Sequence, residues 1–457
     1  MNIAVLDIGK TNIKFAVFGA AGDVKFEHQI PNVVLPGPPY PHVDVEKIWA
    51  FLGASLREAS KSLDIHTLVP TTHGATGAVM TGDGLVLPIM DYEFAGLQAI
   101  AEPYGKLRDE FNKTFSPDMS FGLNWGRQLA WQKWHNGAAF EKATAIVAYP
   151  QYWVWRLTGK FANDLCSLGC HTDLWLPLEN RPSGLAEALG VAALLSPIEP
   201  PWQNMGNIQP KVADAFGLKY DIKVLCGIHD SNASLLPYLS ENENPLTILS
   251  TGTWAVAMAL GHSLSGLRRD MDMNANIDAV GRATACARFM GGREFAVIAG
   301  DCSDEPSMKG IQRLIRDRVI ALPSFSPSGG PYSKHKGEII GECAAKDRSN
   351  LATLYCALMC NVILNNLDAL HGDIIVKGNF AHNSALTGIL AQMRPRQRIF
   401  VSVAQNSTAH CAALLEQWPL KNTTPDLSLI QPAKIDQLDK YHAQWMELIT
   451  KTHPPVN

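Results

Sequence analysis

The chain has 457 residues, of which 46% are hydrophobic and 18% are charged, and its formal net charge is −4. Because a single hydrophobic core stops growing near about 250–300 residues, this length predicts two domains of similar size. The composition excludes a disordered or repetitive chain. The slightly acidic balance gives no reason to expect nucleic acid or an acidic membrane as a partner.

The sequence also indicates a compartment. The first apolar run is interrupted at Asp7, too early for the apolar core of a secretion signal, and no stretch approaches the length of a membrane span. The nine cysteines are odd in number and scattered along the chain, which favours a reducing environment over a disulfide framework. We therefore expect a cytoplasmic protein that has no membrane partner and whose cysteines are buried thiols.

Strand and helix patterns alternate along the first half of the chain. After an opening hairpin we expect, in order, a helix over 44–63, a strand over 66–69, a strand over 85–90, a helix over 124–134, a strand and then a helix over 143–159, a helical segment over 176–201, and a short strand over 224–227.

The second half repeats the pattern. It begins with another hairpin and continues with an amphipathic helix over 351–370, a strand over 374–378 and a helical tail from 432. The polar stretch 241–245 is the expected domain boundary. Alternating strands and helices throughout predict an α/β fold.

The two hairpins share a glycine turn with hydroxyl neighbours. The first turn contains Gly9, and the second contains Gly252. A glycine there lets backbone N–H groups approach phosphate oxygens, since no Cβ blocks them. The first turn also includes the residues Lys10, Thr11 and Asn12, and the second is bordered by Thr251 and Thr253.

Either turn alone is more often an ordinary polar hairpin. The pair is harder to explain that way, because the first copy also carries Asp7 and Lys14. Those are the charges that a metal–phosphate site requires. Neither a P-loop nor a Rossmann fingerprint is present, so a cradle made by two hairpins is the remaining way to hold a nucleotide.

A third candidate is Asp230, which follows a short apolar strand. A carboxylate at a strand end that opens a helix can accept the proton of a sugar hydroxyl. It can equally be a helix N-cap, and the spacing does not decide between the two. For the neighbouring His229, a packed core histidine is the favoured interpretation.

These motifs resemble the FGGY carbohydrate kinases, a branch of the actin/hexokinase/heat-shock ATPase superfamily. The opening D-x-G-T-[ST]-x-x-[RK] pattern is matched by Asp7, Gly9 and Lys14, with Lys10 where threonine is usual. The catalytic G-x-x-D segment is matched by Gly227 and Asp230. The second phosphate motif is matched by Gly252 and Thr253. The branch that phosphorylates rhamnulose and fuculose is the most similar.

Weaker matches follow the same order along nearly the whole chain. Thr72-His73-Gly74-Ala75 is similar to the sugar-binding segment of pentulose kinases, and Asp91 falls in a second sugar segment. Residues 152–159 are very like the family's Y-L-x-x-x-L-T-G stretch. The adenosine segment carries Gly378-Asn379 where two glycines are usual, and a further nucleotide-side loop is replaced by Ser328-Gly329-Gly330-Pro331.

The resemblance implies two ribonuclease-H-like domains that flank a deep cleft, with sugar bound by residues 1–241 and ATP by residues 242–457. It implies Asp230 as general base and Asp7, with Asp230, as the carboxylates for Mg²⁺. The phosphates of ATP would be bound by the two turns and Lys14, and adenosine by the Gly378-Asn379 segment. The expected sugar-binding residues are His73, Gly74, Asp91, His229 and Asp230.

For the substrate we expect a ketose with a primary hydroxyl. A 6-deoxyketohexose such as L-rhamnulose or L-fuculose is preferred, and a pentulose such as xylulose or ribulose is the near alternative. A binding or regulatory protein that kept the fold and lost turnover is the alternative from another class, supported only by the altered nucleotide segments. A homodimer is compatible with the fold, but no interface is visible in the sequence.

Overall fold

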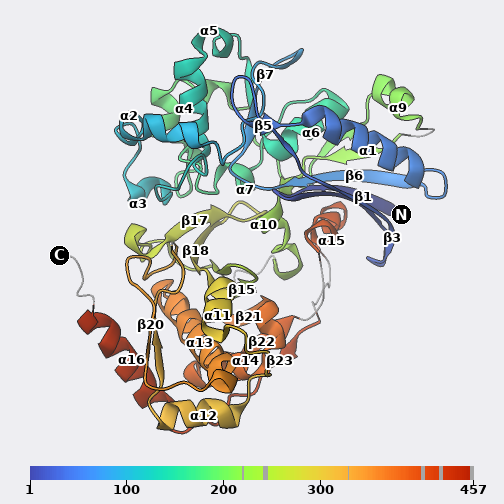
Figure 1. Ribbon diagram of the computed structural model, residues 1–457. Coiled ribbons are helices and arrows are strands. Elements are labelled where there is room, and N and C mark those ends of the chain that lie inside the picture. Colours follow the sequence, from blue (N-terminus) through green and yellow to red (C-terminus); the bar gives the residue numbers. More distant parts are fainter. Residues whose placement is uncertain (219–220, 240–244, 328, 403–406, 421–425, 453–457) are drawn as a thin grey trace. The chain divides into compact units, whose positions relative to one another are not determined.

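The computed structural model describes residues 1–218, 221–239, 245–327, 329–402, 407–420 and 426–452 (Figure 1). The chain divides into two compact units. The first comprises Met1–Ser240, Ala275–Ala283 and Gln405–Thr423, and the second comprises Glu241–Asn274, Thr284–Ala404 and Thr424–Asn457. The boundary expected between residues 241 and 242 lies outside the described residues, and two later segments group with the first unit.

A seven-stranded sheet forms the centre of the first unit. Its strands are β1 (Asn2–Ile8), β2 (Asn12–Phe18), β3 (Val24–Pro31), β6 (Ile65–Thr72), β12 (Asn204–Asn207), β13 (Lys223–Leu225) and β14 (Ile228–His229). β1 pairs antiparallel with β2 and parallel with β6, while β13 and β14 both pair parallel with β6. Because β1 lies inside the sheet, its apolar run is buried on both faces.

Helices and shorter strands surround this sheet. The helices are α1 (Val45–Ala59), α2 (Ala101–Gly105), α3 (Phe111–Thr114), α4 (Trp125–His135), α5 (Gly137–Phe140), α6 (Tyr149–Thr158), α7 (Leu165–Leu168), α8 (Gly184–Ala188), α9 (Pro210–Phe216), α10 (Asp230–Ala233) and α15 (Thr408–Ala413). The shorter strands are β4 (Val34–Leu35), β5 (His42–Val43), β7 (Gly77–Thr81), β8 (Gly84–Leu85), β9 (Ala145–Ala148), β10 (Trp175–Leu176) and β11 (Arg181–Pro182). α15 packs on β1 and β6, which explains why its segment groups with this unit.

The second unit has a seven-stranded sheet with the same central pairing. Its strands are β15 (Leu246–Thr251), β16 (Ala255–Leu260), β17 (Met273–Ile277), β18 (Ala283–Phe289), β21 (Asp373–Gly378), β22 (Ile399–Ser402) and β23 (Ser428–Leu429). β15 pairs antiparallel with β16 and parallel with β21, as β1 does with β2 and β6. The two hairpins predicted from sequence therefore occupy equivalent positions in two sheets.

The second unit's remaining elements are the short strands β19 (Ile320–Leu322) and β20 (Glu338–Ile340), and the helices α11 (Gly291–Ala299), α12 (Met308–Arg316), α13 (Arg348–Asn366), α14 (Ser384–Met393) and α16 (Leu438–Thr452). α13 contacts both α11 and α14 (Figure 1). All residues from Ser349 to Leu364 are buried, so the predicted amphipathic face is wrong. A helix enclosed by other helices has no solvent side.

Two sequence predictions in the first unit are also wrong. The only helical elements of the described segment 176–201 are α8 and a short 3₁₀ turn, Ala192–Leu194, since β11, glycines and prolines interrupt it. The strand predicted over 85–90 ends at Leu85, where β8 ends, and Pro88 has no N–H to continue a ladder. Among the described residues, no helix is long and apolar enough to cross a membrane.

Candidate functional site

The turn between β1 and β2 is closed by its own backbone. The Gly9 amide donates a hydrogen bond to the Asn12 carbonyl at 2.9 Å, and the Asn32 side chain donates to the Gly9 carbonyl at 2.8 Å. A Cβ on Gly9 would lie 3.2 Å from the Asn12 oxygen. Thr11 and Asn12 are exposed at the tip of the turn. The turn thus presents backbone that an anion can approach.

Asp7 and Lys14 face each other across β1 and β2, where they form a register pair. Burial, followed by the negative charge of Asp230, raises the pKa of Asp7 to about 7, and Lys14 opposes this shift. The Lys14 ammonium also lies 2.7 Å from a carboxylate oxygen of Glu27 on β3. Asp7 is therefore a carboxyl whose negative charge is poorly compensated, as is expected of a cation site.

The sheet brings Asp230 close to Asp7, because β6 lies between β1 and β14. Thr71 on β6 is the register partner of Asp7 on one side and of Ile228 on the other. Asp230 is the first residue of α10, and the N-cap is His229. The N-cap interpretation of Asp230 is therefore wrong.

The Asp230 carboxylate is held by its neighbours. One of its oxygens lies 3.2 Å from His229 Nε2 and accepts a hydrogen bond from the Ser231 amide. Burial by itself would raise the pKa of Asp230, but the hydrogen bond and charge of His229, with a contribution from His73, hold it below its ordinary value. Asp230 is thus ionised at neutral pH, as a proton acceptor must be.

His229 is buried, as the sequence indicated, and is fixed on both ring nitrogens. Its Nδ1 lies 2.9 Å from the side-chain oxygen of Asn232. A Cβ on Gly74 would lie 2.6 Å from Nε2, so this close approach requires glycine. Cys170 also interacts with His229: burial would raise the pKa of this thiol, but the charges of His171 and His229 lower it to about 5.

Sequence reasoning did not find Asn232 or Cys170 as members of this cluster. Asn232 is three residues from His229 on a short helix, a spacing that can place both side chains together. Cys170 is distant in sequence, and no pattern in the sequence indicates its contact.

His73 follows β6, and its amide donates to the Ile8 carbonyl at 2.9 Å. Its ring centroid lies 5.3 Å from that of Tyr92, edge to face, and 5.2 Å from that of Tyr149. Burial lowers the pKa of His73, so its ring is neutral at neutral pH. Tyr149 is fully buried behind His73, whereas His73 and Tyr92 are partly exposed and offer apolar faces with polar edges, which suits a small polyol.

Lys10 connects the predicted phosphate residues with the predicted sugar residues. Its ammonium forms an ion pair with Asp91, lies 3.3 Å from Glu93, and lies 4.7 Å from the centre of the Tyr92 ring. The lysine that replaces the usual threonine is therefore bound to the sugar-side segment in this structure.

The turn of the second hairpin has no charge of its own. The Gly252 amide donates to the Trp254 carbonyl at 2.8 Å, and Thr253 is exposed. The Thr251 hydroxyl donates to the Lys377 carbonyl at 2.6 Å and accepts from the Phe380 amide at 2.9 Å. Because this hydroxyl already has hydrogen bonds within the unit, a phosphate at this turn would bind to the backbone amides and not to the Thr251 side chain.

Gly378 lies beside this turn, at a position where any other residue would be strained. Its φ is +81°, and a Cβ would lie 1.9 Å from the Thr251 carbonyl oxygen. Asn379, next in sequence, is exposed. The turn and the predicted adenosine segment therefore meet within one unit. The start of α11 also approaches, since a Cβ on Gly292 would lie 2.3 Å from the Gly252 oxygen.

A further cluster near this turn was missed. The Arg288 guanidinium lies 5.0 Å from the centre of the Trp254 ring and 3.0 Å from Asp272, whose carboxylate also accepts from the Gly330 amide at 2.8 Å. This gives the unusual Gly329-Gly330 segment a role, because Gly329 packs on Trp254. Ser328, the first residue of that segment, lies outside the described residues.

The described residues contain no group of three or more His, Cys, Asp or Glu side chains that could hold a metal ion. Asp7 and Asp230 supply two carboxylates. Mg²⁺ is commonly bound in this way, by one or two carboxylates with the remaining ligands from water and substrate phosphates. The residues present therefore fit a magnesium ion that arrives with a nucleotide.

Comparison with known proteins agrees with this fold. Residues 99–237 match the N-terminal domain of the FGGY family of carbohydrate kinases, and residues 243–424 match the C-terminal domain of carbohydrate kinase FGGY. The crystal structure of a carbohydrate kinase from Novosphingobium aromaticivorans is 31% identical, with a TM-score of 0.90, over 98% of this chain and 100% of that chain. The chain belongs to the FGGY family of carbohydrate kinases.

More distant relatives differ in their substrates. The chain is 24% identical to the L-fuculokinase of Escherichia coli K12 over 265 residues, which is 56% of this chain and 56% of that relative's length. The xylulose kinase of Lactobacillus acidophilus is 14% identical, with a TM-score of 0.77 over 98% of this chain and 96% of that chain, and it shares the fold. The family and the two-domain actin-like ATPase fold predicted from the sequence are confirmed.

Proposed function

We propose that the protein transfers the terminal phosphoryl group of ATP to a primary hydroxyl of a ketose. The observation that carries this proposal is that Asp7 and the strand leading to Asp230 both pair with Thr71 of β6. His73 lies two residues after Thr71. In this proposal one sheet brings the proton acceptor and the cation site next to His73. Phosphoryl transfer needs these parts together with a phosphate cradle.

In this proposal Asp230 accepts the proton of the attacking hydroxyl. Its carboxylate is ionised, is oriented by the Ser231 amide and is partly exposed, so a substrate hydroxyl can reach it. His229 keeps the carboxylate in position, and Asn232 keeps His229 in position. General base catalysis of this kind contributes about 10²–10⁴-fold to rates.

Asp7, with Asp230, would bind Mg²⁺, whose contribution is to neutralise charge on the phosphates. Burial and the charge of Asp230 raise the pKa of Asp7 to about 7, which means that a nearby positive charge would stabilise its carboxylate. Lys14, paired in register with Asp7, is a cation whose charge opposes this rise in the pKa.

We propose that backbone amides of the Gly9 turn in the first unit and of the Gly252 turn in the second bind the phosphates of ATP. Adenosine would bind the second unit beside Gly378 and Asn379, and the sugar would bind the first unit. The support is that Gly378 joins the Gly252 turn directly, while His73 and Asp91 lie with the Gly9 turn.

For the substrate we propose a 6-deoxyketohexose, with L-fuculose or L-rhamnulose preferred over a pentulose. Curated relatives that match the sequence are named L-fuculokinase and rhamnulokinase. The xylulose kinases share the fold at 16% identity or below. The partly exposed ring of Tyr92 beside His73 offers an apolar edge that suits a methyl group in place of a hydroxyl.

The proposal is tested by measuring ADP release with Mg·ATP against L-fuculose, L-rhamnulose, xylulose, ribulose, glycerol and a panel of aldoses. Phosphorus NMR of the product then identifies which hydroxyl is modified. We expect the highest kcat/KM with a deoxyketohexose and a phosphate ester on a primary carbon. Equal rates with all sugars, or a product esterified at a secondary carbon, would contradict the proposed substrate class.

A further inference from the structure

The second unit contains a cavity of about 400 Å³ between the ends of α13 and α14 and the start of α16. It lies at the opposite end of the sheet from the Gly252 turn. His371 lines the cavity just before β21 begins, whereas Gly378 at the turn is the last residue of β21. Six residues of strand span about 20 Å, so the cavity is separate from the proposed phosphate turn.

Arg394 lines this cavity and is buried, with only 6% of its surface exposed. Its guanidinium donates to side-chain oxygens of Gln397 at 2.7 Å, Asn361 at 2.9 Å and Asn365 at 2.8 Å, and to the Ala369 carbonyl. All four acceptors are neutral. No carboxylate of the described residues forms an ion pair with Arg394, and burial lowers its pKa to about 10. Buried charges are normally paired with an opposite charge, whereas the buried charge of Arg394 has only neutral partners among the described residues.

The amides around Arg394 have their orientation fixed. Gln397 Nε2 donates to the carbonyls of His371 at 3.1 Å and Gly372 at 2.9 Å, which leaves its oxygen for Arg394. Asn361 and Asn365 likewise present their oxygens to the guanidinium. Both asparagines line the cavity, and their NH₂ groups remain as hydrogen-bond donors for a ligand.

The rest of the lining is mostly positive or neutral. Arg396 is exposed at the rim, and His442 from α16 has a buried Nε2 without a hydrogen-bond partner in the described part of the chain. Asp439, which is exposed, is the carboxylate of this lining. The cavity therefore combines a buried cation, a second arginine and several donors on a protein whose net charge is −4.

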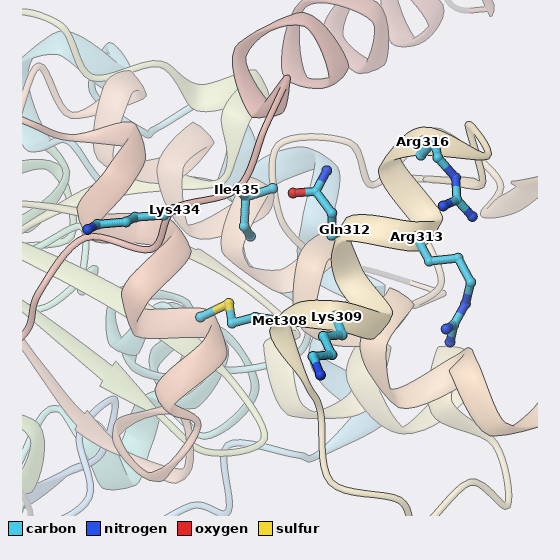
Figure 2. A pocket seen from close by; sticks show the side chains of 7 residues that line it. All are labelled: Met308, Lys309, Gln312, Arg313, Arg316, Lys434 and Ile435. Carbon is cyan, nitrogen blue, oxygen red and sulfur yellow. The ribbon is translucent and has the colours of Figure 1, made fainter.

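A second basic hollow, of about 500 Å³ beside α12, is less suited to hold a ligand (Figure 2). Its two arginines already have partners, since Arg313 pairs with Asp347 and Arg316 with Asp317 at 2.9 Å. In Figure 2 both arginine side chains lie on one side of α12, and Lys434 lies on the other. These cations do not converge on one point.

We propose that the Arg394 cavity is a binding site for a small organic anion, one that carries a phosphate or carboxylate group which Arg394 and Arg396 neutralise. A volume of about 400 Å³ exceeds that of a bare ion and falls in the range of about 300–1,000 Å³ that is usual for small-molecule sites. The site is independent of the sugar and nucleotide residues proposed above.

The test is isothermal titration calorimetry on the full chain with glycerol 3-phosphate, citrate and inorganic phosphate as separate probes. A saturating non-hydrolysable ATP analogue is present, so that binding at the nucleotide site does not contribute. We expect one of the two organic probes to bind more tightly than inorganic phosphate. The stronger of the two identifies whether the site prefers a phosphate ester or a carboxylate.

Variants locate the binding. Arg394→Gln should abolish it, and circular dichroism shows whether that variant folds. Because Arg394 also joins three segments, the decisive pair is at the exposed rim: Arg396→Gln should weaken binding about three-fold and Asp439→Asn should strengthen it about two-fold. Arg398→Gln is the matched control, since Arg398 pairs with Asp373 at 2.7 Å and does not line the cavity.

The proposal is overturned if neither organic probe binds. It is equally overturned if Arg396→Gln and Asp439→Asn leave the affinity unchanged, or if Arg398→Gln weakens binding as much as Arg396→Gln. Loss of sugar kinase activity would not affect these outcomes, because binding is measured directly.

Discussion

The β1–β2 hairpin and the β15–β16 hairpin occupy the same place in two sheets of the same topology, yet their surroundings differ. The first hairpin carries Asp7 and Lys14 as a register pair. At the corresponding place the second has Ser250 opposite Val256 and Thr251 opposite Ala255. The strands beside the first turn thus carry a charged pair, while the corresponding positions beside the second turn are neutral and the turn packs closely against Gly378.

The difference shows how one supersecondary unit can serve two tasks. A charged turn can organise a cation and a proton transfer, whereas a neutral, tightly packed turn can position phosphates and the group attached to them. The comparison predicts that substitutions in the first hairpin act on turnover. Substitutions in the second should act on folding or on nucleotide affinity.

Among substitutions in the two hairpins, the largest effect is expected for Asp7→Asn, which removes a carboxylate proposed for the metal. We expect kcat to fall about 10²–10³-fold with the KM for sugar little changed. Steady-state kinetics over a range of Mg²⁺ concentrations measures this. A variant with the wild-type Mg²⁺ dependence would show that Asp7 is not a metal ligand.

The same variant should be more stable than the wild type when Mg²⁺ is removed with EDTA. The pKa of Asp7 is about 7 in the folded protein against 3.8 ordinarily, so between these values the folded state binds more protons than the unfolded state. The stability that the raised pKa of Asp7 gives the folded protein is therefore complete below pH 4 and is lost as the pH rises to 7. Thermal unfolding at pH 5 and pH 8 should show a gain for Asp7→Asn that is larger at pH 8. An equal gain at both values would contradict the shifted pKa.

Gly378→Ala should mainly affect folding. A Cβ would lie 1.9 Å from the Thr251 carbonyl oxygen, and the backbone has a φ of +81°, so the second hairpin must shift. We expect a loss of about 3 kcal/mol in the free energy of unfolding, measured by urea denaturation. Gly252→Ala is the control, because no atom lies within 4 Å of its added Cβ. Equal stability of the two variants would contradict the packing account.

Gly252→Ala should instead weaken nucleotide binding. Its Cβ fits the free protein but would occupy the space that a phosphate needs beside the turn. We expect the KM for ATP to rise about ten-fold, with unchanged stability and an unchanged KM for sugar. If the KM for ATP stays at the wild-type value, the turn does not contact phosphate.

The smallest effect is expected for Lys10→Thr, which restores the residue usual in the family. Because Lys10 is bound by Asp91 and Glu93, its loss should free Asp91 on the sugar side. We expect the KM for sugar to change about two- to five-fold and the KM for ATP to change less. If the KM for ATP changes more than the KM for sugar, Lys10 must leave Asp91 and bind phosphate when ATP is present.

Much of this structure could be predicted from the sequence because it depends on local signals. The apolar run of β1, the glycine turns and the short strand before Asp230 each determine their own backbone. The predicted helix over 176–201 failed because apolar residues there pack in irregular segments that glycines and prolines interrupt. The amphipathic assignment of α13 failed because its neighbours, and not its own sequence, determine that it is enclosed.

The site divides in the same way. Asp7 and Asp230 could be named from the sequence because each lies at the end of a short apolar strand, and His73 because its segment resembles the sugar-binding segment of the family. The sequence did not predict the ion pair between Lys10 and Asp91, the contact of Cys170 with His229, or the buried Arg394 without a counter-ion. Each depends on side chains brought together from distant segments, for which the sequence holds no periodic signal.

The most direct test of the account is a comparison of Asp230→Asn with Asp221→Asn, an exposed aspartate in the same unit. Single-turnover phosphoryl transfer to the best sugar and equilibrium binding of sugar and of Mg·ATP should be measured for both. We predict that Asp230→Asn lowers the transfer rate about 10³-fold and retains sugar binding, while Asp221→Asn matches the wild type. A near-normal transfer rate in folded Asp230→Asn would contradict the assignment of Asp230 as the base.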